Sequence, residues 1–306
     1  MKKTLRRTVA LGCSVLLMMS LALPLSAATA QNSHMTQVLE MDSTYEGFLA
    51  NDDTLTYEEI ASLPGASIRY EIDSIEEMKK MSDKELINLK MEENDIKKLR
   101  TESTKKIVLD NAAKLSKTAL VSKGLSKEAI ANIKSGNYEN LSDADVRAAS
   151  SKLAFNIASV SRTSGQCNYN IYWHWDSAPS VKYTDPIAAC ISNGYVVQGS
   201  STAKLIYKDE NGYLEDTNKR IYPVYTSNGN VKFDIEMLHA TSWGPQYCQA
   251  GKAFVANAGP VTSGTILINA YYFHSWTPGT VEVSFNVGSI SFSGKGSEEG
   301  HAQYLA

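Results

Sequence analysis

Long apolar runs are missing from this 306-residue chain beyond its first 25 residues. A helix that spans a bilayer needs about 20 consecutive apolar residues, so we expect no integral membrane span in the mature chain. An excess of positive charge is missing as well, because 30 Lys and Arg stand against 33 Asp and Glu. Proteins that bind nucleic acid carry clustered basic charge, and this class of partner is therefore excluded.

The first 30 residues have the order of a secretory signal peptide. Four basic residues precede an apolar run from Val9 to Leu25, and small residues follow, ending in Ala28-Thr29-Ala30. We predict cleavage after Ala30 and a secreted, extracellular protein. A retained anchor is the alternative, but the run has about 17 residues and is interrupted by Pro24. Cleavage would leave 26 Lys and Arg against 33 Asp and Glu, a net charge of −7.

Tryptophan is absent from residues 31–160, which hold 22 acidic residues, 17 basic residues and only six of the 27 aromatic residues. Residues 161–306 hold all four tryptophans. Charged, aromatic-poor sequence favours helices, and aromatic-rich sequence favours strands. We expect an α+β protein with short charged helices over residues 31–160 and an antiparallel β-sandwich over residues 161–306. The helical region is interpreted either as a bundle or arm of the working molecule or as a pro-segment that is removed.

Four hydroxyl residues in the helical region have the pattern of a helix N-cap. Each lies between two apolar residues that form a hydrophobic staple around the first turn, and three of them have an acidic residue three positions later. The four are Thr56, Ser82, Ser126 and Ser142. Apolar periodicity predicts a further helix over residues 102–121, and the stripe Val146, Ala149, Leu153 and Ile157 predicts that the last helix extends to residue 157.

Asn-Gly dipeptides, which suit the positive φ angles of tight hairpins, occur at residues 193–194, 211–212 and 228–229. Residues 205–208 are expected to pair with 213–214, and residues 222–225 with 231–237. Residues 265–273 are apolar on both faces, as in a central strand. The apolar parity of the last strand switches across Gly288, which predicts a β-bulge. The polar residues 294–300 are expected to form a mobile tail.

Three cysteines remain after the predicted cleavage, namely Cys167, Cys190 and Cys248. In an oxidising environment an odd number leaves either one disulfide and one thiol, or three thiols. We predict a disulfide between Cys190 and Cys248, which would close a loop of about 58 residues and contribute about 4 kcal/mol. The alternative is that Cys248 is a nucleophile with His239 or His274 as its base.

Aromatic and polar residues alternate between Asn168 and Pro179. On a strand, Trp173 and Trp175 point to one face, which suits a core, while the polar residues point to the other. That second face is either solvated or a binding surface. A metal site needs three or four ligands, and because only two share a recognisable spacing here, we expect no metal and no other cofactor. The predicted binding residues are Tyr172, His174, Asp176, Trp243 and Trp276.

The run Trp173-His174-Trp175-Asp176-Ser177-Ala178-Pro179, with Thr184-Asp185 after it, resembles a pattern in secreted proteins of Gram-positive bacteria. These have a signal peptide, a charged helical N-terminal part and a β-rich C-terminal part. Some resemble large, bacteriocin-like antibacterial proteins. The resemblance implies secretion by a bacterium and supplies no catalytic residues.

The sequence has no phosphate-binding glycine loop, no G-x-S-x-G elbow and no H-E-x-x-H helix, which are the signatures of common enzyme sites. We therefore expect a secreted, non-enzymatic protein that binds a component of a cell envelope or another cell surface, with antibacterial action as its sharpest form. Two alternatives are a secreted hydrolase built on His174, Asp176, His239 or Cys248, and an extracellular structural protein.

Overall fold

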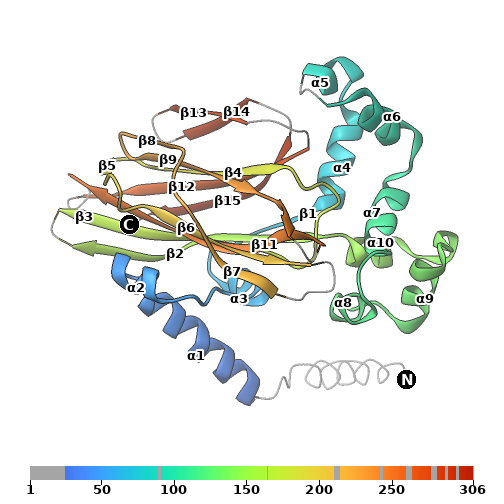
Figure 1. Cartoon of the computed structure of the whole chain (residues 1–306), viewed down its shortest axis with the longest axis horizontal. Helices are drawn as coiled ribbons and strands as arrows, with labels where there is room; N and C mark the ends of the chain where they lie inside the picture. Colours follow the sequence, from blue (N-terminus) through green and yellow to red (C-terminus); the bar gives the residue numbers. More distant parts are fainter. Residues whose placement is uncertain are drawn as a thin grey trace, which may run out of the picture.

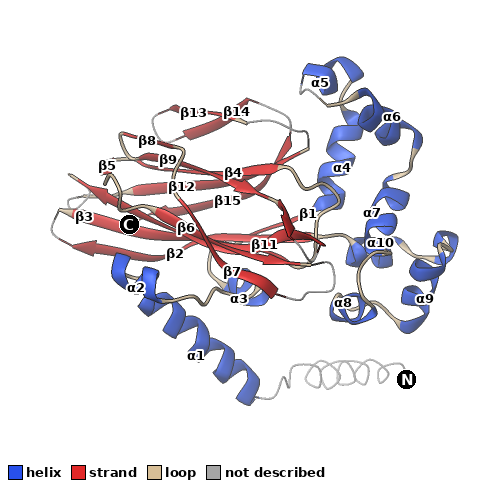
Figure 2. Cartoon of the chain, in the orientation of Figure 1, coloured by secondary structure: helices blue, strands red, loops and turns tan. Residues whose placement is uncertain are grey.

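The computed structural model describes residues 25–88, 91–163, 165–209, 214–241, 244–259, 264–276, 281–286, 289–293 and 296–305. Helices occupy most of the first half and antiparallel strands the second (Figures 1 and 2), which confirms the α+β class and the sandwich-like arrangement. The predicted signal peptide lies largely outside the described residues. Among the described residues, no helix has the length and apolar character needed to cross a bilayer.

Two antiparallel sheets stack on each other. Sheet A runs in the order β1 (Ser67–Tyr70), β2 (Lys152–Thr163), β3 (Gln166–Trp175), β11 (Gly244–Ala258), β6 (Thr202–Lys208) and β7 (Leu214–Ile221), and β5 (Tyr195–Val196) and β10 (Leu238–Thr241) also pair with β11. Sheet B runs in the order β15 (Gly296–Leu305), β12 (Leu267–Ser275), β4 (Thr184–Ile191), β9 (Asn230–Glu236) and β8 (Tyr225–Ser227). A separate hairpin joins β13 (Glu282–Asn286) to β14 (Ser289–Ser293).

The main core lies between the two sheets and contains the predicted apolar face of β3. Tyr169, Ile171, Trp173 and Trp175 are all fully buried in it. Gly251 of β11 faces Trp173, and a Cβ atom at this position would lie 2.3 Å from the indole ring. The glycine therefore allows the indole to lie directly against the neighbouring strand. Residues 265–273 fall largely in β12, which has a strand on each side, as expected of a central strand.

The Asn-Gly dipeptides have different outcomes. Asn228-Gly229 forms the predicted hairpin turn between β8 and β9, with φ angles of 44° and 80°. The dipeptide at 211–212 lies outside the described residues, although the strands on either side of it, β6 and β7, do pair. Asn193-Gly194 does not close a hairpin, because β4 belongs to sheet B and β5 pairs with β11 in sheet A. This turn carries the chain from one sheet to the other.

Among the described residues between 71 and 149, seven α-helices and one short 3-10 helix (Tyr138–Asn140) gather at one end of the sheets (Figure 2), and we call this part the helical lobe. All four predicted caps are confirmed, and Thr56, Ser82 and Ser142 form complete capping boxes. The helices of the lobe are α4 (Glu71–Lys80), α5 (Asp83–Asn88), α6 (Glu93–Thr101), α7 (Thr104–Ala112), α8 (Lys117–Ser122), α9 (Lys127–Ser135) and α10 (Asp143–Ala149).

Two helix predictions are wrong in extent. The helix expected over residues 102–121 is divided into α7 and α8, because Ser116 caps a new helix with its hydroxyl. The last helix ends at Ala149, and Leu153 and Ile157 lie instead in β2, where both side chains join the sandwich core. The expected border at residue 161 thus falls inside β2, and the first half of the chain supplies both β1 and most of β2.

One prediction near the C-terminus is wrong and another is not tested. Gly288, the position of the expected bulge, lies outside the described residues, although the strands on either side of it, β13 and β14, pair with each other. The expected mobile tail is in large part β15, which pairs with β12 along its length. Gly300 lies against the ring of Phe155, where a Cβ atom would be 2.7 Å from the phenylalanine side chain. Polar composition misled this prediction, because the backbone of β15 pairs and Ala302 enters the core.

Three helices at the N-terminus lie along the outer face of sheet A (Figure 1). They are α1 (Leu25–Met41), α2 (Tyr45–Ala50) and α3 (Tyr57–Ser62). Leu55 and Ile60 pack on Ala154 of β2 and Tyr172 of β3. These three helices therefore cover the sheet face that is opposite the main core, and they are separate from the helical lobe.

Candidate functional site

A pocket of about 520 Å³ lies where the helical lobe meets the sandwich. The lobe contributes side chains from α4, α6 and α7. The sandwich contributes residues 180–183 before β4, the start of β11 and Trp276 just after β12. A volume of this size accommodates a small organic ligand or a short segment of a polymer.

The pocket wall has an apolar part and a charged part. Met78, Met91 and Leu99 of the lobe face Trp276 of the sandwich, and flexible methionine side chains adapt to ligands of different shape. Lys98 and Asp95 of α6 add charges of opposite sign. The lining therefore suits an amphipathic ligand that has an apolar surface and hydrogen-bonding groups.

Gln246 of β11 is the most distinctive group in the pocket wall. The residue lines the pocket and is 1% exposed, yet neither Oε1 nor Nε2 of its side chain has a hydrogen-bond partner among the described residues. Leaving a buried polar group unpaired costs about 1–3 kcal/mol. Both atoms are closed off from water, so a ligand that offers one donor and one acceptor side by side would pair them once the side chain turns toward the pocket, and would then recover this cost.

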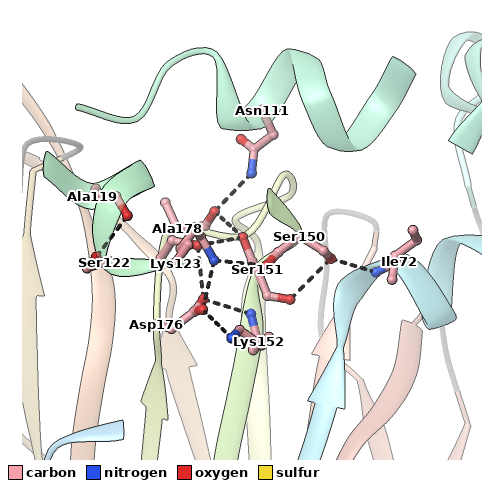
Figure 3. A network of polar contacts seen from close by, with 11 residues as sticks. Ile72, Asn111, Ala119, Ser122, Lys123, Ser150, Ser151, Lys152, Asp176 and Ala178 are labelled. Carbon is pink, nitrogen blue, oxygen red and sulfur yellow. Dashed lines mark hydrogen bonds and ion pairs between the residues drawn. The ribbon is translucent and has the colours of Figure 1, made fainter. Parts of the chain in front are cut away.

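A buried ion-pair network fixes the lobe against the sandwich beside the pocket (Figure 3). Nζ of Lys123 donates to Oδ2 of Asp176 at 2.7 Å and to the Ser150 carbonyl at 2.9 Å. The backbone N–H of Lys152, at the start of β2, donates to Oδ1 of Asp176 at 2.9 Å. The carboxylate at the end of β3 thus holds both the segment that follows α8 and the segment that follows α10.

The same network reaches the pocket wall. Nδ2 of Asn111, a pocket residue on α7, donates to the Ala178 carbonyl at 2.9 Å. Oγ of Ser151 donates to the same carbonyl at 2.7 Å (Figure 3). Since α7 supplies one side of the pocket, the network determines how far apart the two sides of the pocket stand.

Buried carboxylates lie behind the wall that the sandwich provides. Glu71, at the start of α4, accepts a hydrogen bond from the Ser180 backbone at 2.6 Å, and burial raises the pKa of its carboxyl group. Asp185 of β4 lies 2.9 Å from Nδ1 of His274 and accepts the Ser275 N–H at 2.8 Å. The ring of His274 is in edge contact with Trp276 at a centroid distance of 5.3 Å. Trp276 therefore packs against a histidine whose own position is fixed by a hydrogen bond to Asp185.

The predicted binding residues do not form one site. Tyr172 and His174 lie on the outer face of sheet A beneath the N-terminal helices, where Nδ1 of His174 lies 3.0 Å from the Leu55 carbonyl. Burial lowers the pKa of His174 to about 4. Asp176 belongs to the ion-pair network, and Trp243 lies outside the described residues. Of the predicted residues that the structure describes, Trp276 lines the pocket.

The predicted disulfide is not formed, because Cys167, Cys190 and Cys248 are buried free thiols. Cys248 belongs to β11 of sheet A and packs in the core between the sheets. Cys190 belongs to β4 of sheet B, where its neighbours Ala189 and Ile191 are the residues that enter that core. Because side chains alternate along a strand, Cys190 points away from Cys248.

The groups expected for a hydrolase are separated or occupied. Burial raises the pKa of the Cys248 thiol far above its ordinary value, so the nucleophilic thiolate is suppressed. His239 packs against Tyr207 at a ring-centroid distance of 5.5 Å, and Nδ1 of His274 is paired with Asp185. Within the described residues, no group of three or more His, Cys, Asp and Glu side chains is placed to hold a metal ion.

Sequence reasoning missed Gln246 and the pocket residues of the helical lobe. Gln246 carries no motif, and its significance comes from burial without a partner, which a sequence does not reveal. A weak signal was present in Met78 and Met91, because methionine is frequent at adaptable binding surfaces.

The sequence matches no protein-family model and no curated protein. Similar solved structures include manganese lipoxygenase of Gaeumannomyces graminis with partial zonadhesin of Komagataella pastoris (6% identity, 47% of this chain, 47% of that chain, TM-score 0.25). Another is the collagen-binding subdomain of the Enterococcus faecalis surface protein ACE (7% identity, 49% of this chain, 91% of that chain, TM-score 0.24). A third is Clostridium perfringens delta-toxin (8% identity, 51% of this chain, 83% of that chain, TM-score 0.17). The first match spans less than half of that chain. Scores this low carry no argument about fold or function.

Proposed function

We propose that this protein is a secreted, non-enzymatic binding protein whose pocket at the junction of lobe and sandwich holds a component of a cell envelope. The observation that carries the proposal is Gln246, a buried amide that lines the pocket with both of its polar atoms unpaired. An amide group in a ligand presents a donor and an acceptor side by side and is complementary to it. The polymers of a bacterial cell wall are rich in such groups.

Binding accounts for the site better than catalysis does. The thiol of Cys248 is buried, Asp176 is held by two lysines, and His174 has a lowered pKa beneath the N-terminal helices. A nucleophile and its base must lie within hydrogen-bond reach of each other, and the Cys248 thiol donates to the Ala250 carbonyl instead of to His239 or His274. The pocket instead combines apolar contact area with a few polar groups, as binding sites do.

The cell envelope as target rests on the secretion signal and on the resemblance to secreted proteins of Gram-positive bacteria. Antibacterial action is the sharpest form of the proposal, because a protein that is exported and that binds wall polymers meets the envelopes of neighbouring cells. In that form, added protein would slow the growth of Gram-positive cells that bind it.

Co-sedimentation with Gram-positive cell-envelope fractions tests the proposal. The wild-type chain should sediment with at least one fraction, and Gln246→Leu should weaken binding about tenfold, because the loss of a hydrogen-bonded pair of about 1.4 kcal/mol is a factor of ten. Gln249→Leu is the matched control, since Gln249 is a buried glutamine of the same strand that does not line the pocket. Failure of the wild-type chain to bind any fraction, or unchanged binding by Gln246→Leu, would refute the proposal.

A further inference from the structure

A polar row crosses sheet A on the face that α1 and α2 cover. Lys252 of β11 is paired in register with Tyr172 of β3 on one side and with Lys204 of β6 on the other. Tyr172 is in turn paired with Asn156 of β2. All four are buried, and the lysines are 1% and 3% exposed. Two ammonium groups side by side on a buried face repel each other, so this row requires an anionic occupant.

Asp42, which follows α1, occupies the centre of the row. Nζ of Lys252 lies 2.7 Å from both carboxylate oxygens, and the Tyr172 hydroxyl donates to Oδ2 at 2.7 Å. Nδ2 of Asn51 donates to Oδ1 at 3.0 Å. The Asp42 carboxylate is fully buried, and its two oxygens accept hydrogen bonds from one charged donor, the Lys252 ammonium, and from two neutral donors, the Tyr172 hydroxyl and the Asn51 amide.

The sheet also holds the main chain of this segment. Nδ2 of Asn170 donates to the Asp42 carbonyl at 2.7 Å. Nζ of Lys204 donates to the carbonyls of Leu49 and Asn51 at 2.9 and 2.8 Å, and to the Asp52 carboxylate at 2.8 Å. Recognition of three peptide carbonyls together with a side-chain carboxylate is the chemistry of binding an acidic peptide.

An aromatic side chain completes the contact. Phe48 of α2 is fully buried, and its ring centre lies 5.0 Å from Nζ of Lys252 and 5.6 Å from Nζ of Lys204. The ring also packs against Phe254 of β11 at a centroid distance of 5.6 Å. The occupant that this face recognises is thus a peptide with an acidic residue and an aromatic residue six positions later.

The chemistry of the row suits an occupant that binds reversibly. A buried ion pair is often no more stabilising than apolar residues of similar volume, so a permanently covered face has no need of two lysines. A polar face also stays hydrated when it is uncovered. The two lysines are covered by residues 25–53, which we call the arm, and Leu55 and Ile60 beyond the arm also pack on Tyr172.

We propose that the row formed by Tyr172, Lys252 and Lys204 is a binding site for an acidic, aromatic-containing peptide segment of a partner protein, and that the arm is its internal occupant. The site lies on the outer face of sheet A, whereas the pocket lies at the junction of lobe and sandwich. The inference is therefore independent of the proposed function and survives its failure.

Peptide binding by the full chain tests the site. The probe is a fluorescein-labelled peptide of residues 36–53, and the receptor is the full chain carrying Asp42→Asn and Phe48→Ala, which weaken its own arm. The peptide should bind this variant with an affinity at least about tenfold higher than that of the same peptide carrying Asp42→Asn, because a charge-assisted contact is lost. Lys252→Met in the receptor should abolish the difference, and Lys232→Met on sheet B, a buried lysine outside the row, should not.

Hydrogen exchange of the wild-type chain keeps the proposal falsifiable if the variant fails to fold. The backbone amides of α2 should exchange through an opening that leaves the amides of β3 and β11 protected. Exchange of arm and sheet amides at one common rate would overturn the proposal, because the arm would then leave only when the sheet unfolds. Equal affinity of a folded receptor for both peptides, or no binding of either, would overturn it as well.

Discussion

Lys123 of the helical lobe and Asp176 at the end of β3 form an ion pair with an Nζ–Oδ2 distance of 2.7 Å, and their side chains are only 3% and 12% exposed. The pair joins two parts of the chain that the sequence presents as separate regions. Because Asp176 also accepts the Lys152 backbone N–H, the carboxylate sets the position of the lobe against the sandwich and with it the width of the pocket.

Asp176→Asn should lower the free energy of unfolding by about 3 kcal/mol, because it leaves the Lys123 ammonium buried without its counter-charge. Burial already lowers the pKa of Lys123. Asp73→Asn is the control, since it breaks an ion pair with Arg147 in which the Arg147 side chain is 50% exposed and the Asp73 side chain 38% exposed. It should lower the free energy of unfolding by less than about 1 kcal/mol. Urea unfolding of both variants provides the comparison, and equal losses would contradict the structural role of Asp176.

Ser142→Ala should lower the free energy of unfolding by about 1 kcal/mol, because the Ser142 hydroxyl accepts the Asp145 N–H and completes the capping box of α10. Ser135→Ala, in the last turn of α9, removes only a bond from Oγ to a carbonyl of its own helix and should have little effect. Thermal unfolding followed by circular dichroism measures both, and a larger effect at Ser135 would argue against the cap.

His174 should make stability depend on pH. Burial is the main cause that lowers its pKa from 6.5 to about 4, with Lys208 lowering it and Asp176 raising it. Between about pH 6.5 and 4 the unfolded chain binds a proton that the folded chain does not, so this group destabilises the fold as the pH falls through that range. We expect a loss of about 2 kcal/mol, because the ring is partly exposed and solvent screens part of the effect.

Comparison with His174→Gln isolates this contribution. Urea unfolding of the wild-type chain and of the variant at pH 7.5 and pH 4.5 should give a stability difference that shifts in favour of the variant at the lower pH. A difference that does not change with pH would show that His174 does not titrate in this range. The raised pKa of Glu71 has the opposite sign, since it favours the fold as the pH falls, and it cancels in the comparison.

The three cysteines should all react as thiols, and only after unfolding. Cys167, Cys190 and Cys248 are buried, so maleimide should label none of them in the native protein and all three in denaturant, without prior reduction. Intact mass and N-terminal sequencing of protein recovered from culture medium would check this together with the predicted start at Gln31. A start near Ser161 would instead identify residues 31–160 as a pro-segment, and a mass two units lower would indicate a disulfide.

Local patterns predicted local structure well. The caps at Thr56 and Ser142, the turn at Asn228-Gly229 and the inward face of Trp173 and Trp175 follow from interactions within a few residues of the chain. Composition predicted the class of fold. It failed for residues 296–305, where pairing with β12 decides the structure of a polar segment.

The site was less predictable because it depends on contacts between distant segments. Asp176 and His174 were selected as one polar face, but the lobe pairs with Asp176, and the segment just before α3 contacts His174. The bridge between Cys190 and Cys248 failed because Cys190 points away from the core that Cys248 enters. Gln246 carried no signal, since nothing in a sequence shows that a glutamine will be buried without a partner.

Hydrogen exchange of the chain with and without a saturating amount of Gram-positive envelope material shows directly whether the ligand binds in the pocket. Binding there should add protection in α4, α6 and α7 and at the backbone amides around Ser180 and Gln246, with β8 and β9 unchanged. Protection confined to surfaces away from the junction of lobe and sandwich, or no change at any amide, would contradict it.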